Sequence, residues 1–173
     1  MISELDKTYM KMATTLADMS KCISHQVACI IAKDGKIIST GINGSPPGYT
    51  NCCDHYEHMF ITDYSQEQCR DITRLESQGV PDSHHEWSNL HEIHAEQNAI
   101  ANAAKHGISV DGATAYTALK PCLHCSKLLI SAGISRIVYK YVYERHENPK
   151  TNEMLRFCRI SVEQILDEPV EIR

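Results

Sequence analysis

Two short motifs contain residue types that can bind a metal and transfer protons. They are His94-Ala95-Glu96 and Pro121-Cys122-Leu123-His124-Cys125. A catalytic zinc needs three protein ligands and an open fourth position for water, and His94, Cys122 and Cys125 provide such a set. If a helix begins at the second motif, both cysteines share its first turn, where Pro121 gives up no needed N–H group. The free N–H groups and the helix dipole there favour the thiolate form of both cysteines.

Glu96 lies two residues beyond His94, where it can reach a zinc-bound water without being a ligand. Zinc lowers the pKa of its bound water from about 15.7 toward roughly 7, and we expect Glu96 to shuttle the protons. The alternative is a structural zinc beside an ordinary surface glutamate, and a C-x-x-C motif alone would favour it. The combination of three ligands, Glu96 and Pro121 favours catalysis. We expect His124, between the two cysteines, to be a bystander.

Composition is typical of an ordinary soluble globular protein. The chain has 173 residues, 42% of them hydrophobic, which suits one domain over 1–173. Apolar runs are too short for a membrane span and the N-terminus has no signal-peptide pattern, so we expect a cytoplasmic protein. The net charge of −5 disfavours a nucleic acid polymer as partner but allows a small anionic ligand.

We interpret the eight cysteines as metal ligands and buried thiols and not as a disulfide framework, because no secretory signal is present. Cys29 lies in an apolar run and Cys158 follows an amphipathic segment. We expect both to be small core residues.

The elements that position the motifs follow from hydrophobic periodicity and from turn and cap residues. Helices are expected at residues 3–19 (with Ser3 as N-cap), 92–106 (ended by Gly107), 121–132 (ended by Gly133) and 148–157. Strands are expected at 26–32, 36–42, 112–118, 135–141 and 160–165, the first two joined by an Asp-Gly turn. This order predicts a mixed sheet with helices on both faces. Residues 43–90 form an insertion with few periodic apolar positions, in which 64–78 could hold a short helix.

A segment after the second expected strand indicates a family. Ser39-Thr-Gly-Ile-Asn-Gly-Ser-Pro-Pro-Gly48 resembles the G-x-N-G-x-P-x-G segment of deoxycytidylate deaminases, and Ser20-Lys21-Cys22 and Asn51-Cys52-Cys53 flank it as in the phage enzymes. The metal motifs match the H-x-E…P-C-x-x-C signature of the cytidine deaminase superfamily, to which these enzymes belong. The resemblance runs from about residue 10 to 145. It implies a three-layer α/β/α fold with a central mixed five-stranded sheet.

The resemblance also implies a reaction and its control. The substrate would be dCMP, deaminated by hydrolysis to dUMP and ammonia for thymidylate synthesis, with Glu96 protonating N3 and the leaving ammonia. A homo-hexamer, activation by dCTP and inhibition by dTTP are expected, with Mg²⁺ accompanying the triphosphate. Deaminases of dCTP or free cytidine are the nearest alternatives. A polynucleotide-editing deaminase and a non-catalytic zinc-bound interaction domain are more remote ones.

By analogy with the family, particular residues would bind the nucleotides. Asn43, Ala95 and Tyr143 would contact the substrate, Asn43 through its deoxyribose. The regulatory nucleotide would be held by Lys21, Gly44, Ser45 and Gly48, because glycine-rich turns bring N–H groups close to phosphates. The alternatives are a plain turn for Asn43 and the glycines and edge packing for Tyr143.

A second zinc is also implied by the phage enzymes. Their structural zinc pattern falls here on Cys22, Cys52, His84 and Glu92, a set that suits a closed tetrahedral site. Three neighbours remain as alternative ligands: Cys53, His85 and His91. Such a site would tie the two ends of the insertion together.

Overall fold

The computed structural model describes residues 1–59, 83–143 and 148–166. At its centre lies a five-stranded sheet in the order β2-β1-β3-β4-β5. The strands are β1 (Ala28–Lys33), β2 (Lys36–Ile42), β3 (Thr114–Leu119), β4 (Arg136–Tyr141) and β5 (Ser161–Gln164). β1 runs antiparallel to both β2 and β3, whereas β3, β4 and β5 are parallel. The predicted mixed five-stranded sheet is thus confirmed.

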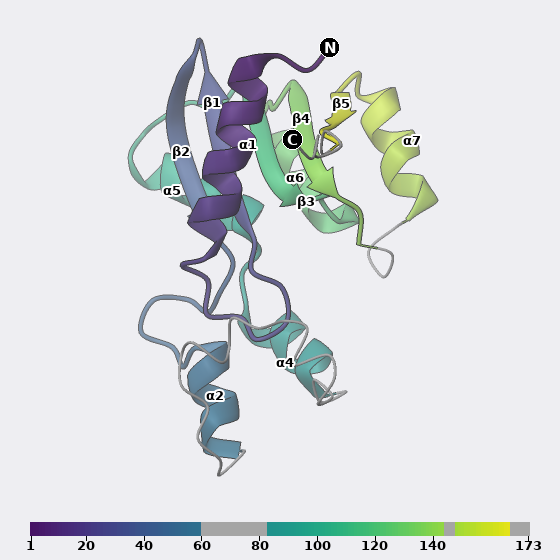
Figure 1. Cartoon of the computed structure of the whole chain (residues 1–173). Helices are drawn as coiled ribbons and strands as arrows, with labels where there is room; N and C mark the ends of the chain where they lie inside the picture. Colours follow the sequence, from purple (N-terminus) through teal and green to yellow (C-terminus); the bar gives the residue numbers. More distant parts are fainter. Residues whose placement is uncertain (60–82, 144–147, 167–173) are drawn as a thin grey trace, which may run out of the picture.

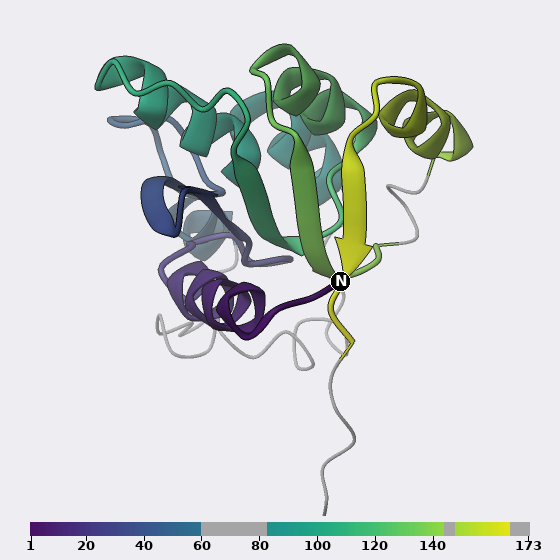
Figure 2. The same cartoon turned by 90° about the horizontal axis from the view of Figure 1, so that it is seen from above.

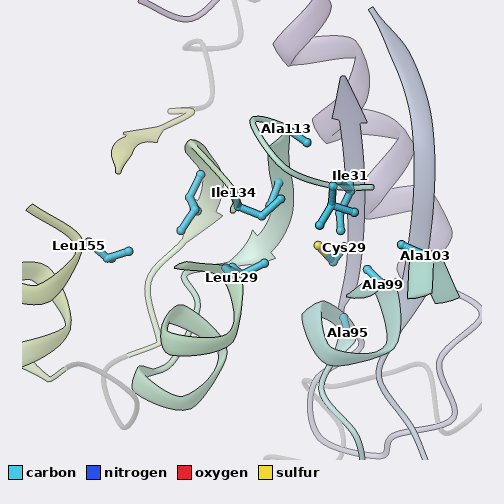
Figure 3. Close-up of a cluster of buried hydrophobic side chains, with 12 residues drawn as sticks. Cys29, Ile31, Ala95, Ala99, Ala103, Ala113, Leu129, Ile134 and Leu155 are labelled. Atoms are coloured by element: carbon cyan, nitrogen blue, oxygen red, sulfur yellow. The ribbon is translucent and has the colours of Figure 1, made fainter. Parts of the chain in front are cut away.

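Helices cover both faces of this sheet, which confirms the three layers (Figures 1 and 2). One face carries α1 (Glu4–Ala17), and the other carries α5 (Ala95–Lys105), α6 (Leu123–Ser131) and α7 (Pro149–Phe157). Side chains alternate along a strand, so Cys29 and Ile31 of β1 point toward α5, while Ile30 points toward α1. Figure 3 shows Cys29 and Ile31 beside Ala99 of α5.

An ion-paired network fastens α1 to the sheet. Asp6 closes a capping box with Ser3 and is buried, and it accepts hydrogen bonds from Arg136 Nη1 at 2.7 Å and from the Tyr116 hydroxyl at 2.7 Å. Arg136 Nε also donates to Glu163 of β5 at 2.9 Å. Burial alone would raise the pKa of Asp6, but the hydrogen bonds outweigh it and hold that pKa well below its usual range.

Two helices of the insertion were not predicted. α2 (Cys52–Met59) and α4 (Ser83–His91) lie together at one end of the sheet (Figure 1). They share a small core of their own, formed by Cys22, Ile23, Cys52, Cys53 and Tyr56 with Trp87 packed against it. The helix expected at 64–78 lies outside the described residues.

Two further expectations need correction. Cys158 is exposed, because it is the C-cap of α7 and lies beyond the face of that helix that packs on the core. Cys29, in contrast, is fully buried, as predicted. Helix α5 begins at Ala95 and not at residue 92, since Ile93 is held in a short β-bridge to Gly44.

Candidate active site

His94 is the N-cap of α5 and therefore lies at a fixed point in the chain. Its backbone is extended (φ −67°, ψ 154°), and its N–H donates to Gln97 Oε1 at 2.9 Å. The His94 carbonyl accepts from the N–H of Asn98 at 3.0 Å, which starts the helical ladder. Gln97 was missed by the sequence analysis, although the spacing of an N-cap residue and a glutamine three positions later is the signature of a capping box.

Cys122 is likewise the N-cap of α6. Its backbone is extended (φ −66°, ψ 172°), and its Sγ accepts from the N–H of Cys125 at 3.5 Å. The helix begins at Leu123, so the expectation that Pro121 lies in the first turn is wrong. Because Cys122 is still extended, the helical turn cannot include the residue before it.

The three predicted donors converge in the structure. His94 Nδ1 lies 3.3 Å from Cys125 Sγ and 3.7 Å from Cys122 Sγ. Zn–S bonds of about 2.3 Å and Zn–N bonds of about 2.0–2.1 Å at tetrahedral angles place such donors about 3.5–3.8 Å apart. One nitrogen and two sulfurs at this spacing therefore suit a zinc ion. His124, between the cysteines, is exposed and is not part of the group.

The two cysteines share one negative charge, which lies on Cys122. The hydrogen bond from the Cys125 thiol, with further help from His94, lowers the pKa of Cys122 to about 3. The same hydrogen bond raises the pKa of Cys125. The hydrogen bond with Cys122 raises the pKa of His94. A thiolate at a helix N-terminus beside an imidazole is a strong ligand for a soft cation.

Glu96 lies beside this group but does not belong to the donor set. Its side chain is buried, at 5% exposure, in the first turn of α5. Burial raises the pKa of Glu96 above its usual value. A carboxyl group with a raised pKa accepts a proton more readily than a carboxylate on the surface, which suits a group that has to take up a proton and pass it on.

A second donor group lies between the sheet and the insertion. The Cys22 thiol lies 3.3 Å from Glu92 Oε2 and 3.8 Å from His84 Nε2, and Cys52 Sγ lies 3.3 Å from the same His84 atom. These four residues come from the loop after α1, from the starts of α2 and α4, and from the residue that follows α4. The structure thus brings together the four side chains of the second predicted set.

The chemistry of this second group also fits a cation. Burial raises the pKa of Glu92 to about 7, and its Oε1 is buried without a hydrogen-bond partner among the described residues. The hydrogen bond from Cys52 lowers the pKa of Cys22 well below its usual value. A buried carboxyl with an unsatisfied oxygen beside a thiolate is costly unless a cation is bound. Four donors leave no open position, as in structural zinc sites.

The three alternative ligands lie outside this group. The Cys53 thiol donates to the Lys21 carbonyl at 2.9 Å, and His91 Nδ1 lies 2.8 Å from the Trp87 carbonyl. His85 is exposed and pairs with Asn89 on the same helix. Each points away from the donors because neighbouring positions on a helix face about 100° apart.

A three-residue segment joins the two donor groups. Glu92 belongs to the second group and His94 to the first. Between them, the N–H of Ile93 donates to the Gly44 carbonyl at 2.9 Å, and the N–H of Gly44 donates to the Ile93 carbonyl at 3.1 Å. This bridge joins residues 49 positions apart, so no local sequence signal could have revealed it.

The predicted substrate contacts surround this junction. The Asn43 side chain accepts from the N–H of Val27 at 2.9 Å and donates to the His25 carbonyl at 2.9 Å, so it holds the loop before β1. Tyr143 packs edge-on against His25, with ring centroids 4.5 Å apart. Ala95 is buried at the start of α5.

The residues predicted for a regulatory nucleotide are spread along one loop and its neighbour. Gly44 (φ +154°) and Gly48 (φ +87°) both adopt a backbone conformation that side chains disfavour. Ser45 Oγ is buried without a partner among the described residues, whereas the Lys21 side chain is exposed.

Stacked rings connect the end of this loop to α4 and α2. Tyr49 stacks on His91, His91 on Trp87, and Trp87 on His55, with centroid distances of 5.4, 4.9 and 4.7 Å. The stack spans α4 and α2, and it packs beside the second donor group through Tyr56 and His84.

Comparison with known proteins places these features in a family. Residues 3–141 match the family model described as the cytidine and deoxycytidylate deaminase zinc-binding region. The chain is 37% identical over 169 residues to the deoxycytidylate deaminase of Enterobacteria phage T4, covering 90% of this chain and 86% of the relative. It is 32% identical over 162 residues to the deoxycytidylate deaminase of Saccharomyces cerevisiae, of which it spans 44%.

A solved structure has a similar fold. The dCMP deaminase of cyanophage S-TIM5, in complex with dCMP and dUMP, superposes with a TM-score of 0.69 at 28% identity. The match covers 95% of this chain and 99% of that protein.

Proposed function

Because the chain belongs to the deoxycytidylate deaminases of the cytidine deaminase superfamily, we propose that it hydrolyses dCMP to dUMP and ammonia. The observation that carries this proposal is the buried Glu96 beside the converging His94, Cys122 and Cys125. A structural metal site has no use for a buried carboxyl that is not a ligand. The phage relatives, which are named deoxycytidylate deaminases, support the same substrate.

Metal binding and proton transfer would be carried out by different residues. His94, Cys122 and Cys125 would hold the zinc, which when bound supplies a water with a pKa lowered toward about 7. Glu96 accepts a proton from the attacking water and delivers it to N3 of the cytosine ring, while the water oxygen bonds to C4. It then takes the second proton from that oxygen and gives it to the amino group, so that the C4–N bond breaks, ammonia leaves and a C4 carbonyl forms. Burial keeps Glu96 out of bulk water, which prevents its proton from exchanging freely.

The second group, Cys22, Cys52, His84 and Glu92, would hold a structural zinc. Support comes from the closed set of four donors and from the unsatisfied Glu92 oxygen. This metal would connect the loop after α1 to both ends of the insertion. It would supply stability that the small core of α2 and α4 lacks.

Nucleotide contacts and control extend the proposal. Asn43, Ala95 and Tyr143 would line the substrate position. The regulatory nucleotide, dCTP as activator or dTTP as inhibitor, would be bound with its Mg²⁺ by Lys21, Gly44, Ser45 and Gly48.

We also propose that the protein forms a homo-hexamer in the cytoplasm and that its product, dUMP, is used for thymidylate synthesis. Among the described residues, no helix has the length and apolarity needed to cross a bilayer.

The test is ammonia release from dCMP by protein of measured zinc content, with and without dCTP. Rapid turnover that rises with dCTP is the expected result. Cytidine, dCTP and a single-stranded oligonucleotide are assayed in parallel. Turnover of one of these and not of dCMP would retain the zinc chemistry but refute the substrate and the interpretation of residues 39–48.

A further inference from the structure

Helix α5 lies in direct backbone contact with the edge strand β2. A Cβ atom built on Gly41 would overlap the Ala95 carbonyl oxygen and the Ala99 backbone nitrogen. Gly41 is a regular strand residue paired with Cys29, so glycine is needed there for space and not for an unusual backbone conformation. Because the opposing atoms are helix backbone, a side chain at this position could be accommodated only by moving the helix.

A hydrogen bond fastens the same helix turn to the next strand residue. Asn98 Nδ2 donates to the Ile42 carbonyl at 2.7 Å. Asn98 lies one turn after His94 and two residues after Glu96, so this contact lies at the N-terminal end of α5, which carries both residues. The bridge between Ile93 and Gly44 lies just before it. The start of α5 is therefore held by β2 and its continuation at Gly41, Ile42 and Gly44.

We propose that Asn98 and Gly41 are positioning residues: they hold the first turn of α5 on β2 and thereby set where Glu96 and His94 lie relative to Cys122 and Cys125. Neither is a ligand, and neither touches the reacting atoms. The inference rests on the proposed function in that Glu96 and His94 are the working groups. A misplacement of about 1 Å in such a group can reduce turnover about 100-fold.

A matched pair of asparagines allows the test. Asn102 lies one turn further along α5 and also contacts β2, donating to Ser39 Oγ and the Thr40 carbonyl at 3.3 Å each. We expect Asn98→Leu to lower kcat for dCMP about 100-fold with KM changed less than about 3-fold. Asn102→Leu should leave kcat within about 2-fold of the wild-type value. It should lower the melting temperature by about as much as Asn98→Leu does.

A metal readout separates this inference from the choice of substrate. In cobalt-substituted protein, Asn98→Leu should shift the thiolate-to-cobalt absorption that comes from Cys122 and Cys125. Asn102→Leu should not shift it, and neither variant should shift the absorption that comes from Cys22 and Cys52. This comparison holds even if dCMP proves not to be the substrate. Wild-type kcat and an unchanged cobalt spectrum in Asn98→Leu would overturn the proposal, and so would equal losses in both variants. Gly41→Ala, if it folds, should reproduce the Asn98→Leu result.

Discussion

The two donor groups use similar atoms but are supported in opposite ways. His94, Cys122 and Cys125 lie at the starts of two helices packed on the sheet, so the core holds their backbones in place whether or not a metal is bound. The second group lies where short helices and loops meet, above a core of only a few side chains. The difference indicates that the fold positions the first group, whereas the second group has to stabilise its own surroundings.

The groups also differ in what lies beside them. The first has three donors and a buried carboxyl outside the set, Glu96. The second includes its carboxyl, Glu92, as one of four donors. An open set beside a proton carrier suits catalysis, and a closed set suits structure. Variants of Glu96 and Cys52 test this contrast.

The largest effect is expected from Glu96→Gln. Glutamine keeps the shape of the side chain but cannot carry a proton, so kcat for dCMP should fall by a factor of about 10³–10⁴. Zinc content, measured by elemental analysis, should stay at the wild-type value. Glu153→Gln on the exposed surface of α7 is the control and should retain activity. Activity retained in Glu96→Gln would refute the proton-shuttle role.

Cys52→Ala should remove one zinc of two and loosen the insertion. Its neighbour provides the control, because Cys53 is also buried but its thiol donates to the Lys21 carbonyl and is not one of the four donors. Cys53→Ala should therefore keep both metals. Limited proteolysis should cut the Cys52→Ala protein within residues 43–91 while leaving the sheet region intact. An unchanged zinc content in Cys52→Ala would rule out the second site.

A smaller, pH-dependent effect is expected where α1 meets the sheet. Asp6→Asn removes a charge from a buried network with Arg136 and should cost about 3 kcal/mol of unfolding free energy at pH 7 without changing zinc content. Lys7→Ala, which breaks an exposed pair with Glu4, should cost less than about 1 kcal/mol.

The difference in unfolding free energy between wild type and Asp6→Asn should depend on pH, because the pKa of Asp6 is lowered in the folded protein. The stabilisation is fully present above the unfolded value of about 3.9 and is lost as the pH falls toward the folded value. The unfolding free energies of wild type and Asp6→Asn, measured by denaturant titration, should therefore converge as the pH falls below about 4. If the difference between these two free energies stays constant down to pH 3, Asp6 is not held as a carboxylate by this network.

The sequence by itself determined the elements of the sheet and the motif that defines the first donor group. The capping residue Ser3, the Asp-Gly turn at 34–35 and the glycines after α5 and α6 are local signals, because each acts through the backbone of its own few residues. His94, Cys122 and Cys125 could be named for the same reason, since each motif is short and opens a helix.

Only the tertiary structure decided which of two adjacent residues faces a partner far along the chain. It turns Cys52 and not Cys53 toward His84, and it leaves Cys158 on the surface. It also contains α2 and α4, whose short polar sequences have little helical signal and depend on contacts with each other. The contact of Gly41 with α5 and the bridge between Gly44 and Ile93 are likewise non-local. Such features depend on how closely distant backbones approach, and that distance is set by the packing of the whole core.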